Sequence, residues 1–207
     1  MKTLKAVSED DAKGVHNSCP TCWTTRGETL EDILANHSEL MELWEISLQT
    51  VKESEMRSRI IGAQTVMNTF KYMFGCKLGH LLLNMTDNLS KTLQSTTMTA
   101  AEGQHLTSLT VKALKNIRND SDFDNLWEAA IQQQQSLDVE EPVLPRKRRC
   151  PVRYETGSRT LYHDFNTAKD KYKAIYFAGV DAAVTCIQER LDQTDWKEYN
   201  ALKGSSF

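Results

Sequence analysis

Apolar residues recur at spacings of three and four along five stretches of the chain, the pattern of helices that bury one face. The first stretch runs from Thr25 to Lys52 and the second from Ser54 to Met85. The second is apolar over more than half of its circumference, which predicts a helix in the middle of a bundle. Two more stretches follow Thr99 and Ser121, and a long one follows Thr167.

Four of these stretches begin with a hydroxyl residue followed three positions later by an acidic residue. In such a capping box the two side chains satisfy backbone amides of the first helical turn, so the spacing marks a helix start. The pairs are Thr25 with Glu28, Thr99 with Glu102, Ser121 with Asp124, and Thr167 with Asp170. No useful length alternates with period two. We therefore predict an all-α fold, a bundle of about five to six helices with one loop rich in proline and arginine.

The pattern divides the chain into four parts. Residues 1–18 are polar and aperiodic, and we expect a disordered lead-in, while residues 19–138 hold the predicted helical bundle. Residues 139–166 hold three of the four prolines and are expected to form a basic linker, because proline lacks the amide hydrogen that helices need. Residues 167–207 are expected to pack on the bundle as a long helix. Its predicted inner face consists of Tyr172, Ile175, Tyr176, Gly179, Ala183, Ile187 and Leu191.

Composition and charge narrow the classes of function. The chain has 207 residues, 40% of them hydrophobic and 26% charged, which is typical of a soluble globular protein. A net charge of -3 leaves no overall positive field to attract nucleic acid or anionic lipid. No window approaches the roughly 18 to 20 apolar residues that span a bilayer, and the first residues do not resemble a secretory signal. We therefore expect an intracellular protein with no membrane partner.

The most compact set of possible metal ligands is His16, Cys19 and Cys22, with His37 further along the chain. Two nearby thiolates and two imidazoles can complete a tetrahedral zinc site. The opposing interpretation is that these residues are structural or idle, because His37 falls on the inner face of the first predicted helix. Five cysteines do not form a disulfide framework in a chain of this size, so reduced thiols are expected. Zinc stays an alternative, and no other cofactor is expected.

Other reactive side chains fit structural roles. Cys76 and Cys186 lie on apolar helix faces, where a thiol is more often a small core residue than a nucleophile. We expect His80 and His105 to be satisfied histidines in the core or at its boundary. The sequence has no glycine-rich phosphate loop, no serine-hydrolase elbow and no zinc-protease helix motif.

A basic run in the linker is the second feature that bears on function. Arg146, Lys147, Arg148 and Arg149, extended by Arg153, place five cations together with no intervening acid. An import receptor with an acidic groove can bind such a strip, and the strip can also neutralise DNA phosphates. The first interpretation predicts a nuclear protein. A merely solvated linker is the third interpretation, and it leaves the protein in the cytoplasm.

Five sequence blocks together carry a resemblance to a known family. They are Cys19–Arg26, Gly75–His80, Thr86–Gln94, Ala101–His105 and Leu144–Arg149. In this order they resemble blocks of hAT-type transposases and of their domesticated relatives, the zinc finger MYM-type protein 1-like chains. The resemblance runs from about Cys19 to the end of the chain. It implies that the chain corresponds to the helical insertion of an RNase H-like transposase domain.

The resemblance also implies what the chain lacks and what it contacts. In that family two aspartates and a glutamate hold metal ions for DNA cleavage, and the insertion lies between the second aspartate and the glutamate. No acidic residue here would then be catalytic, so the chain is not expected to be an enzyme. Relatives usually carry arginine where Cys22 stands, which weakens the zinc interpretation. Trp23, with Arg26 in the same block, would contact DNA by stacking on an extruded base; the alternative for Trp23 is a packing anchor.

From these observations we expect a catalytically incomplete, hAT transposase-like module that acts in the nucleus through DNA or protein contacts. The alternative is a structural helical domain that dimerises through helix faces and does not touch DNA. The partners that follow are DNA, a second copy or a parent transposase-like protein, and an import receptor that binds the basic run.

Overall fold

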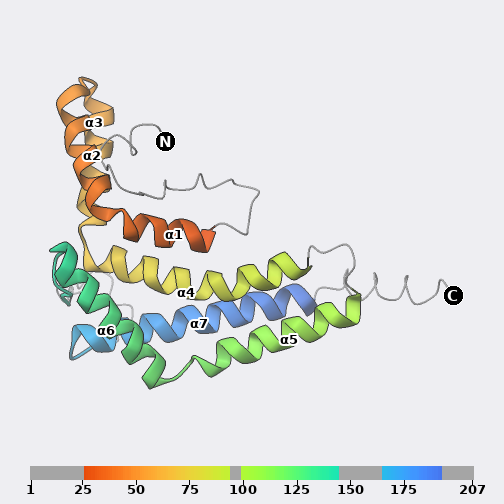
Figure 1. The fold of residues 1–207 in the computed structure, drawn as a ribbon. Helices are drawn as coiled ribbons and strands as arrows, with labels where there is room; N and C mark the ends of the chain where they lie inside the picture. Colours follow the sequence, from red (N-terminus) through yellow and green to blue (C-terminus); the bar gives the residue numbers. More distant parts are fainter. Residues whose placement is uncertain (1–25, 94–98, 145–164, 193–207) are drawn as a thin grey trace, which may run out of the picture.

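The computed structural model describes residues 26–93, 99–144 and 165–192. Within these ranges the chain is all-α, as predicted, with seven helices and no strand (Figure 1). The helices are α1 (Arg26–Ala35), α2 (His37–Thr50), α3 (Ser54–Met67), α4 (Phe70–Leu93), α5 (Ala100–Asn116), α6 (Asp120–Leu137) and α7 (Ala168–Asp192).

Two of the predicted helices are each divided in two, which explains why the structure has more helices than the periodicity predicts. Asn36 separates α1 from α2, and its side-chain amide donates a hydrogen bond to the carbonyl oxygen of Asp32 (2.7 Å). Asn68 and Thr69 separate α3 from α4, and the Thr69 hydroxyl accepts a hydrogen bond from the amide of Tyr72 (3.2 Å). Short polar side chains that bond to nearby backbone compete with helix continuation. The apolar pattern continues through both breaks and hides them.

The helix starts agree with two of the predicted capping boxes. At α5 the reciprocal bonds between Thr99 and Glu102 are both present, and Thr167 and Asp170 exchange the same pair of bonds before α7. The predicted pair at Ser121 is wrong. Asn119 caps α6 instead, accepting a hydrogen bond from the amide of Asp122 (2.9 Å). The first predicted pair includes Thr25, which lies outside the described residues.

The end of α6 coincides with the start of the predicted linker. Asp138 follows the helix in the left-handed conformation (φ 50°), a common way for a helix to end. Val139 is nevertheless buried, and its carbonyl oxygen accepts a hydrogen bond from the side chain of Gln134 (2.6 Å). Residues 139–144 are therefore non-helical but begin against the body of the protein.

An aromatic cluster joins α4, α6 and α7 at the centre of the core. Phe70 of α4 lies with its ring centroid 5.3 Å from Trp127 of α6 and 5.0 Å from Tyr172 of α7. Phe74, one turn further along α4, lies 4.8 Å from the same tyrosine ring. Phe70 is only 2% exposed. Tilted and edge-to-face ring pairs contribute roughly 0.5 to 1.5 kcal/mol each beyond the burial of their area.

The buried face of α7 differs from the predicted one. Tyr172, Tyr176, Val180 and Val184 are buried, four residues apart, which places them along one row of the helix surface. Ile175, predicted for the inner face, lies at the edge of this row and is 39% exposed. The same row explains a second correction. Cys186, predicted as a core residue, is exposed because it lies on the opposite side of the helix from Val184.

The row on α7 also holds α5 in place. Val184 packs with Val111 and Leu114 of α5 in a second buried cluster. The Tyr176 hydroxyl donates a hydrogen bond to the carbonyl oxygen of Ile117, at the end of α5 (2.6 Å). Burial raises the pKa of Tyr176 to about 12, so it stays a donor at physiological pH.

Ion pairs at the surface link α7 to neighbouring segments. Each joins a basic group to a carboxylate, and because solvent screens such surface pairs, each adds little to stability. The pairs are Lys169 with Asp124 (2.7 Å), Lys173 with Asp120 (2.8 Å), and the two-point contact of Arg118 with Asp181 (2.6 and 3.0 Å).

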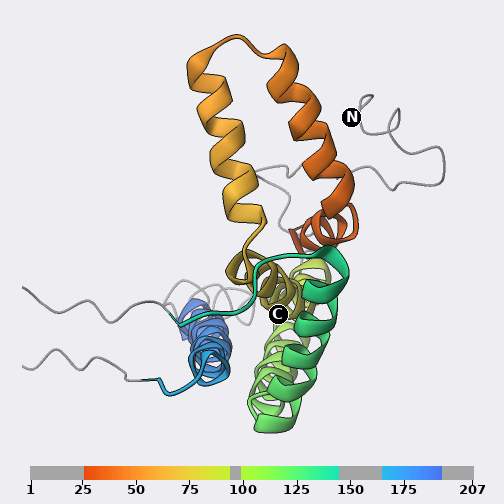
Figure 2. The same cartoon turned by 90° about the vertical axis from the view of Figure 1, so that its left-hand side faces the viewer.

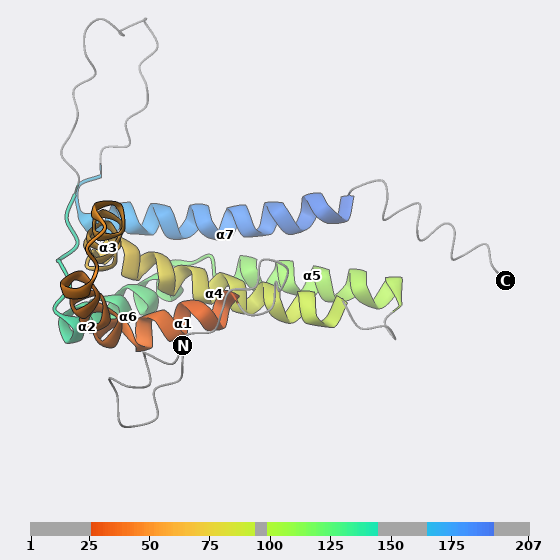
Figure 3. The ribbon, with the colours of Figure 1, turned by 90° about the horizontal axis from the view of Figure 1, so that it is seen from above.

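The helices form a long body from which two helices project. In the body α4 lies between α1 and α7, and α5 runs beside α7 (Figures 1 and 3). The helices α2 and α3 turn away from α1 and α4 and pack on each other as a hairpin (Figure 2). We call this hairpin, residues 37–67, the arm; its base lies at the two breaks and its tip at residues 51–53.

The aromatic cluster yields a stability prediction. Phe70→Ala removes the ring that touches both α6 and α7, and it should lower the free energy of unfolding by about 3 to 5 kcal/mol. Ile175→Ala, at an exposed position of α7, is the control and should change it by less than about 1 kcal/mol. Urea unfolding followed by circular dichroism measures both. Equal effects of the two substitutions would contradict this core.

Candidate functional site

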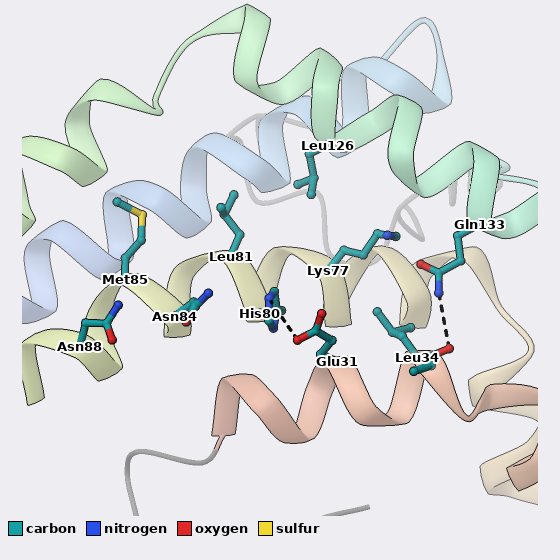
Figure 4. Close-up of a pocket in the computed structure, with 11 residues that line it drawn as sticks. Glu31, Leu34, Lys77, His80, Leu81, Asn84, Met85, Asn88, Leu126 and Gln133 are labelled. Carbon is teal, nitrogen blue, oxygen red and sulfur yellow. Dashed lines mark hydrogen bonds and ion pairs between the residues drawn. The ribbon is translucent and has the colours of Figure 1, made fainter. Parts of the chain in front are cut away.

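A cavity of about 540 Å³ lies between α1, α4 and α6 (Figure 4). Its size falls in the usual range of small-molecule sites. Apolar, amide and ionisable side chains from the three helices line the cavity. The lining consists of Glu31, Leu34, Ala35, Lys77, His80, Leu81, Asn84, Met85, Asn88, Leu126 and Gln133.

The cavity exists because α1 is held along α4. A β-carbon added at Gly79 would lie 2.8 Å from a methyl group of Leu30, so the glycine lets the two helices approach closely. His80 Nδ1 lies 3.0 Å from the carbonyl oxygen of Gly27, and the Asp87 carboxylate accepts a hydrogen bond from the Gly27 amide (3.5 Å). These contacts place His80 at the boundary of the core, hydrogen-bonded as expected. His105 is exposed.

The ionisable side chains of the cavity differ in their neighbours and in their burial. His80 Nε2 lies 3.9 Å from a carboxylate oxygen of Glu31. Lys77 points toward the cavity between Leu34 and Leu126 (Figure 4), and burial lowers the pKa of its ammonium group. Gln133 reaches across from α6 and donates a hydrogen bond to the carbonyl oxygen of Leu34 (3.5 Å). The described lining contains no serine, threonine or cysteine.

A second hollow, of about 530 Å³, lies between α1, α3 and α4 and contains Cys76. Burial raises the pKa of the Cys76 thiol, and the pKa of neighbouring Tyr72 rises to about 12. Both groups therefore stay protonated at neutral pH. A protonated thiol is a poor nucleophile, in keeping with the expected structural role of Cys76.

The arm is distinctive among the described residues because few of its side chains are buried. In α2 and α3 only His37 and Met67 are buried, and both lie at the base, where His37 Nε2 is 3.3 Å from the Met67 carbonyl oxygen. Above the base, large apolar side chains remain exposed. They are Ile46 (43%), Met56 (42%), Ile61 (50%) and Val66 (55%). Met56, Ile61 and Val66 are five residues apart, so they expose apolar area on different sides of α3.

Of the predicted site residues, the structure describes only Arg26 and His37. His16, Cys19, Cys22 and Trp23, like the basic run with Arg153, lie outside the described residues, so their predicted roles stay predictions. Arg26 is the first residue of α1. His37 lies at the base of the arm, where its ring makes the contact with Met67. Within the described ranges no three His, Cys, Asp or Glu residues are grouped as metal ligands.

Sequence reasoning missed both the cavity and the arm. Part of the cavity signal was present, because Lys77, His80, Asn84 and Asn88 recur at helical spacing on α4. Glu31 and Gln133 could not be added to them, since only the packing of α1 and α6 brings those side chains close. The signal for the arm was the two short polar residues that bond to nearby backbone, Asn36 and Thr69.

Comparison of the chain with models of known protein families finds no match. No solved structure matches the fold either. Among the described helices, none has the length and apolar character required to cross a membrane.

The two described cysteines allow a direct check of the packing. In a variant with Cys19, Cys22 and Cys150 replaced by serine, we expect one thiol to react rapidly with a disulfide reagent in the native state. That thiol is Cys186, because it is exposed, whereas Cys76 is buried and protonated. A further Cys186→Ser substitution should abolish the rapid phase, with the remaining thiol reacting only on unfolding. Rapid labelling of Cys76 would mean that α4 is not covered as described.

Proposed function

We propose that this chain is a non-catalytic protein-interaction module whose docking surface is the arm. The observation that carries the proposal is the exposed apolar surface on α2 and α3, above a base where His37 and Met67 are the buried residues. A helical hairpin covers only one side of each of its helices, so the remaining apolar side chains need another surface.

The apolar area exposed on the arm corresponds to a free energy of the same order as the cost of association. Full burial of a large apolar side chain contributes about 1.5 to 3 kcal/mol. The four exposed residues of the arm each retain 42% to 55% of their accessible area. Together these gains are comparable to the lower estimates for the cost of association, about 4 kcal/mol.

The resemblance to the hAT family forms part of the proposal. A chain that corresponds to the helical insertion, without the aspartates and glutamate of the family, would act through contacts and not through metal-dependent strand transfer. The parent transposase-like protein and a second copy are both suitable partners of such a module. The proposed location is the nucleus, reached through the basic run.

Photo-crosslinking tests the arm as a docking surface. A benzophenone amino acid at position 46 or 61 should form covalent protein adducts in cells, because these positions lie on the proposed surface. The same residue at position 175, which is exposed on the body, is the control and should form few adducts. Mass spectrometry identifies the attached protein. If position 175 is as reactive as the arm positions, the arm has no special role.

DNA association is the second candidate, and the basic run of Arg146 to Arg149 with Arg153 favours it. Arg148→Ala with Arg149→Ala should leave the melting temperature unchanged and move a tagged protein out of nuclei. If the run also contacts phosphates, wild-type affinity for duplex DNA should fall steeply with salt, and the double variant should show a shallower dependence. Unchanged distribution and unchanged DNA binding would reduce the run to a solvated linker.

A further inference from the structure

The ammonium group of Lys77 lies in the cavity of the body without a counter-ion. Lys77 is half-buried on α4 and forms no ion pair or hydrogen bond with any described residue. The carboxylate of Glu31 lies instead beside His80 (3.9 Å). Burial lowers the pKa of Lys77, because a cation is solvated less well away from water. The charge of this lysine is therefore not neutralised by the part of the chain that the structure describes.

An apolar row extends along α4 from this cation. Lys77, Leu81 and Met85 are four residues apart, and Figure 4 shows their side chains on the same side of the helix. Leu126 of α6 points toward the row from the opposite wall (Figure 4). From Lys77 to Met85 the helix rises about 12 Å. The cavity thus has a cationic end and an apolar remainder.

The side chain of Gln133 adds a hydrogen-bond donor at the cationic end. In Figure 4 the Lys77 ammonium group points toward the carboxamide of Gln133. One N–H of this carboxamide donates to the carbonyl oxygen of Leu34 (3.5 Å), which leaves its second N–H for another acceptor. A carboxylate placed here accepts hydrogen bonds from Lys77 and Gln133 together. Hydrogen bonds between charged groups are stronger than those between neutral ones.

The remainder of the cavity disfavours a second negative charge. A charged group beside Leu81 and Met85 would lose its water without gaining a counter-ion, which is costly. On the wall formed by α1, the carboxylate of Glu31 repels a further anion. The cavity therefore selects a molecule with one acidic group and an apolar tail.

We infer that the cavity binds a small monocarboxylate whose acidic group pairs with Lys77 and whose apolar chain lies along Leu81, Met85 and Leu126. The volume of about 540 Å³ is sufficient for a ligand of this class. The described lining residues all belong to α1, α4 and α6. This site is therefore in the body, and the inference is independent of the docking surface proposed on the arm.

Calorimetric titration of the full chain with octanoate tests the ligand class. Octanoate should bind with one-to-one stoichiometry. Octanamide has the same chain without the charge, and suberate carries a second carboxylate at the other end of the chain. Each should bind about tenfold more weakly, because the first loses the pairing with Lys77 and the second places a charge on the apolar row. Equal affinity for octanoate and either comparison compound, or no binding of octanoate, overturns the inference.

Substitutions on α4 locate the acidic group. Lys77→Gln should weaken octanoate binding about tenfold. Lys71→Gln is the matched control, because it removes a cation of the second hollow on the same helix, and it should change the affinity by less than about twofold. Without octanoate, Lys77→Gln should melt at or above the wild-type temperature, since an unpaired, half-buried charge does not stabilise the fold. If Lys71→Gln weakens binding and Lys77→Gln does not, octanoate occupies the second hollow and the inference is overturned.

A substitution on α6 supplies the missing counter-ion from within the chain. In Gln133→Glu the new carboxylate takes the place of the ligand's acidic group beside Lys77. Octanoate binding should weaken at least about tenfold, and the melting temperature should not fall. Gln132→Glu, at an exposed position of the same helix, is the control and should change neither quantity. If Gln133→Glu binds octanoate as tightly as the wild type, the acidic group does not lie beside Lys77.

The methyl signal of Met85 in nuclear magnetic resonance spectra reports the place of binding directly. Octanoate should shift this signal in the wild type and leave the signal of Met56, which is exposed on the arm, unchanged. In Lys77→Gln the same shift should require about ten times more octanoate. If octanoate shifts Met56 and leaves Met85 unchanged, it binds on the arm and the inference is overturned.

Discussion

The arrangement of the molecule depends on the contact of Phe70 and Phe74 with Trp127 and Tyr172. These rings lie at the start of α4, the middle of α6 and the start of α7, and they bring together segments about 100 residues apart in the chain. With α4 fixed between α6 and α7, its opposite side is free to receive α1. The cavity lined by Glu31, Lys77 and His80 is a consequence of that placement.

The arm follows from the same constraint. Phe70 is the first residue of α4 and is locked into the core, so the helix before it cannot continue into the body. Asn68 and Thr69 end α3 there, and Asn36 ends α1 at the matching point. The contact between His37 and Met67 ties both breaks together at one place. Beyond this base α2 and α3 pack mainly on each other, which leaves Ile46, Ile61 and Val66 exposed.

Several ionisable groups of the core are protonated by burial or bonded to backbone. Cys76 and Tyr72 are kept protonated by burial, and His80 is engaged with the backbone of Gly27. The arm, by contrast, combines exposed apolar side chains with the three glutamates of α2. The proposed interaction module rests on the exposed apolar side chains of this arm.

The amino-acid sequence by itself determined the all-α class, the caps at Thr99 and Thr167, and the apolar residues that build the core, because these depend on local hydrogen bonds and helical periodicity. Only the tertiary structure decided that two long apolar stretches are each broken, that α6 starts at Asn119, and that Ile175 and Cys186 face outward. Periodicity records which residues are apolar, but not whether a neighbouring helix is present to cover them. The arm has the same stripes as the core, and it is exposed because α4 is already enclosed by α1, α5, α6 and α7.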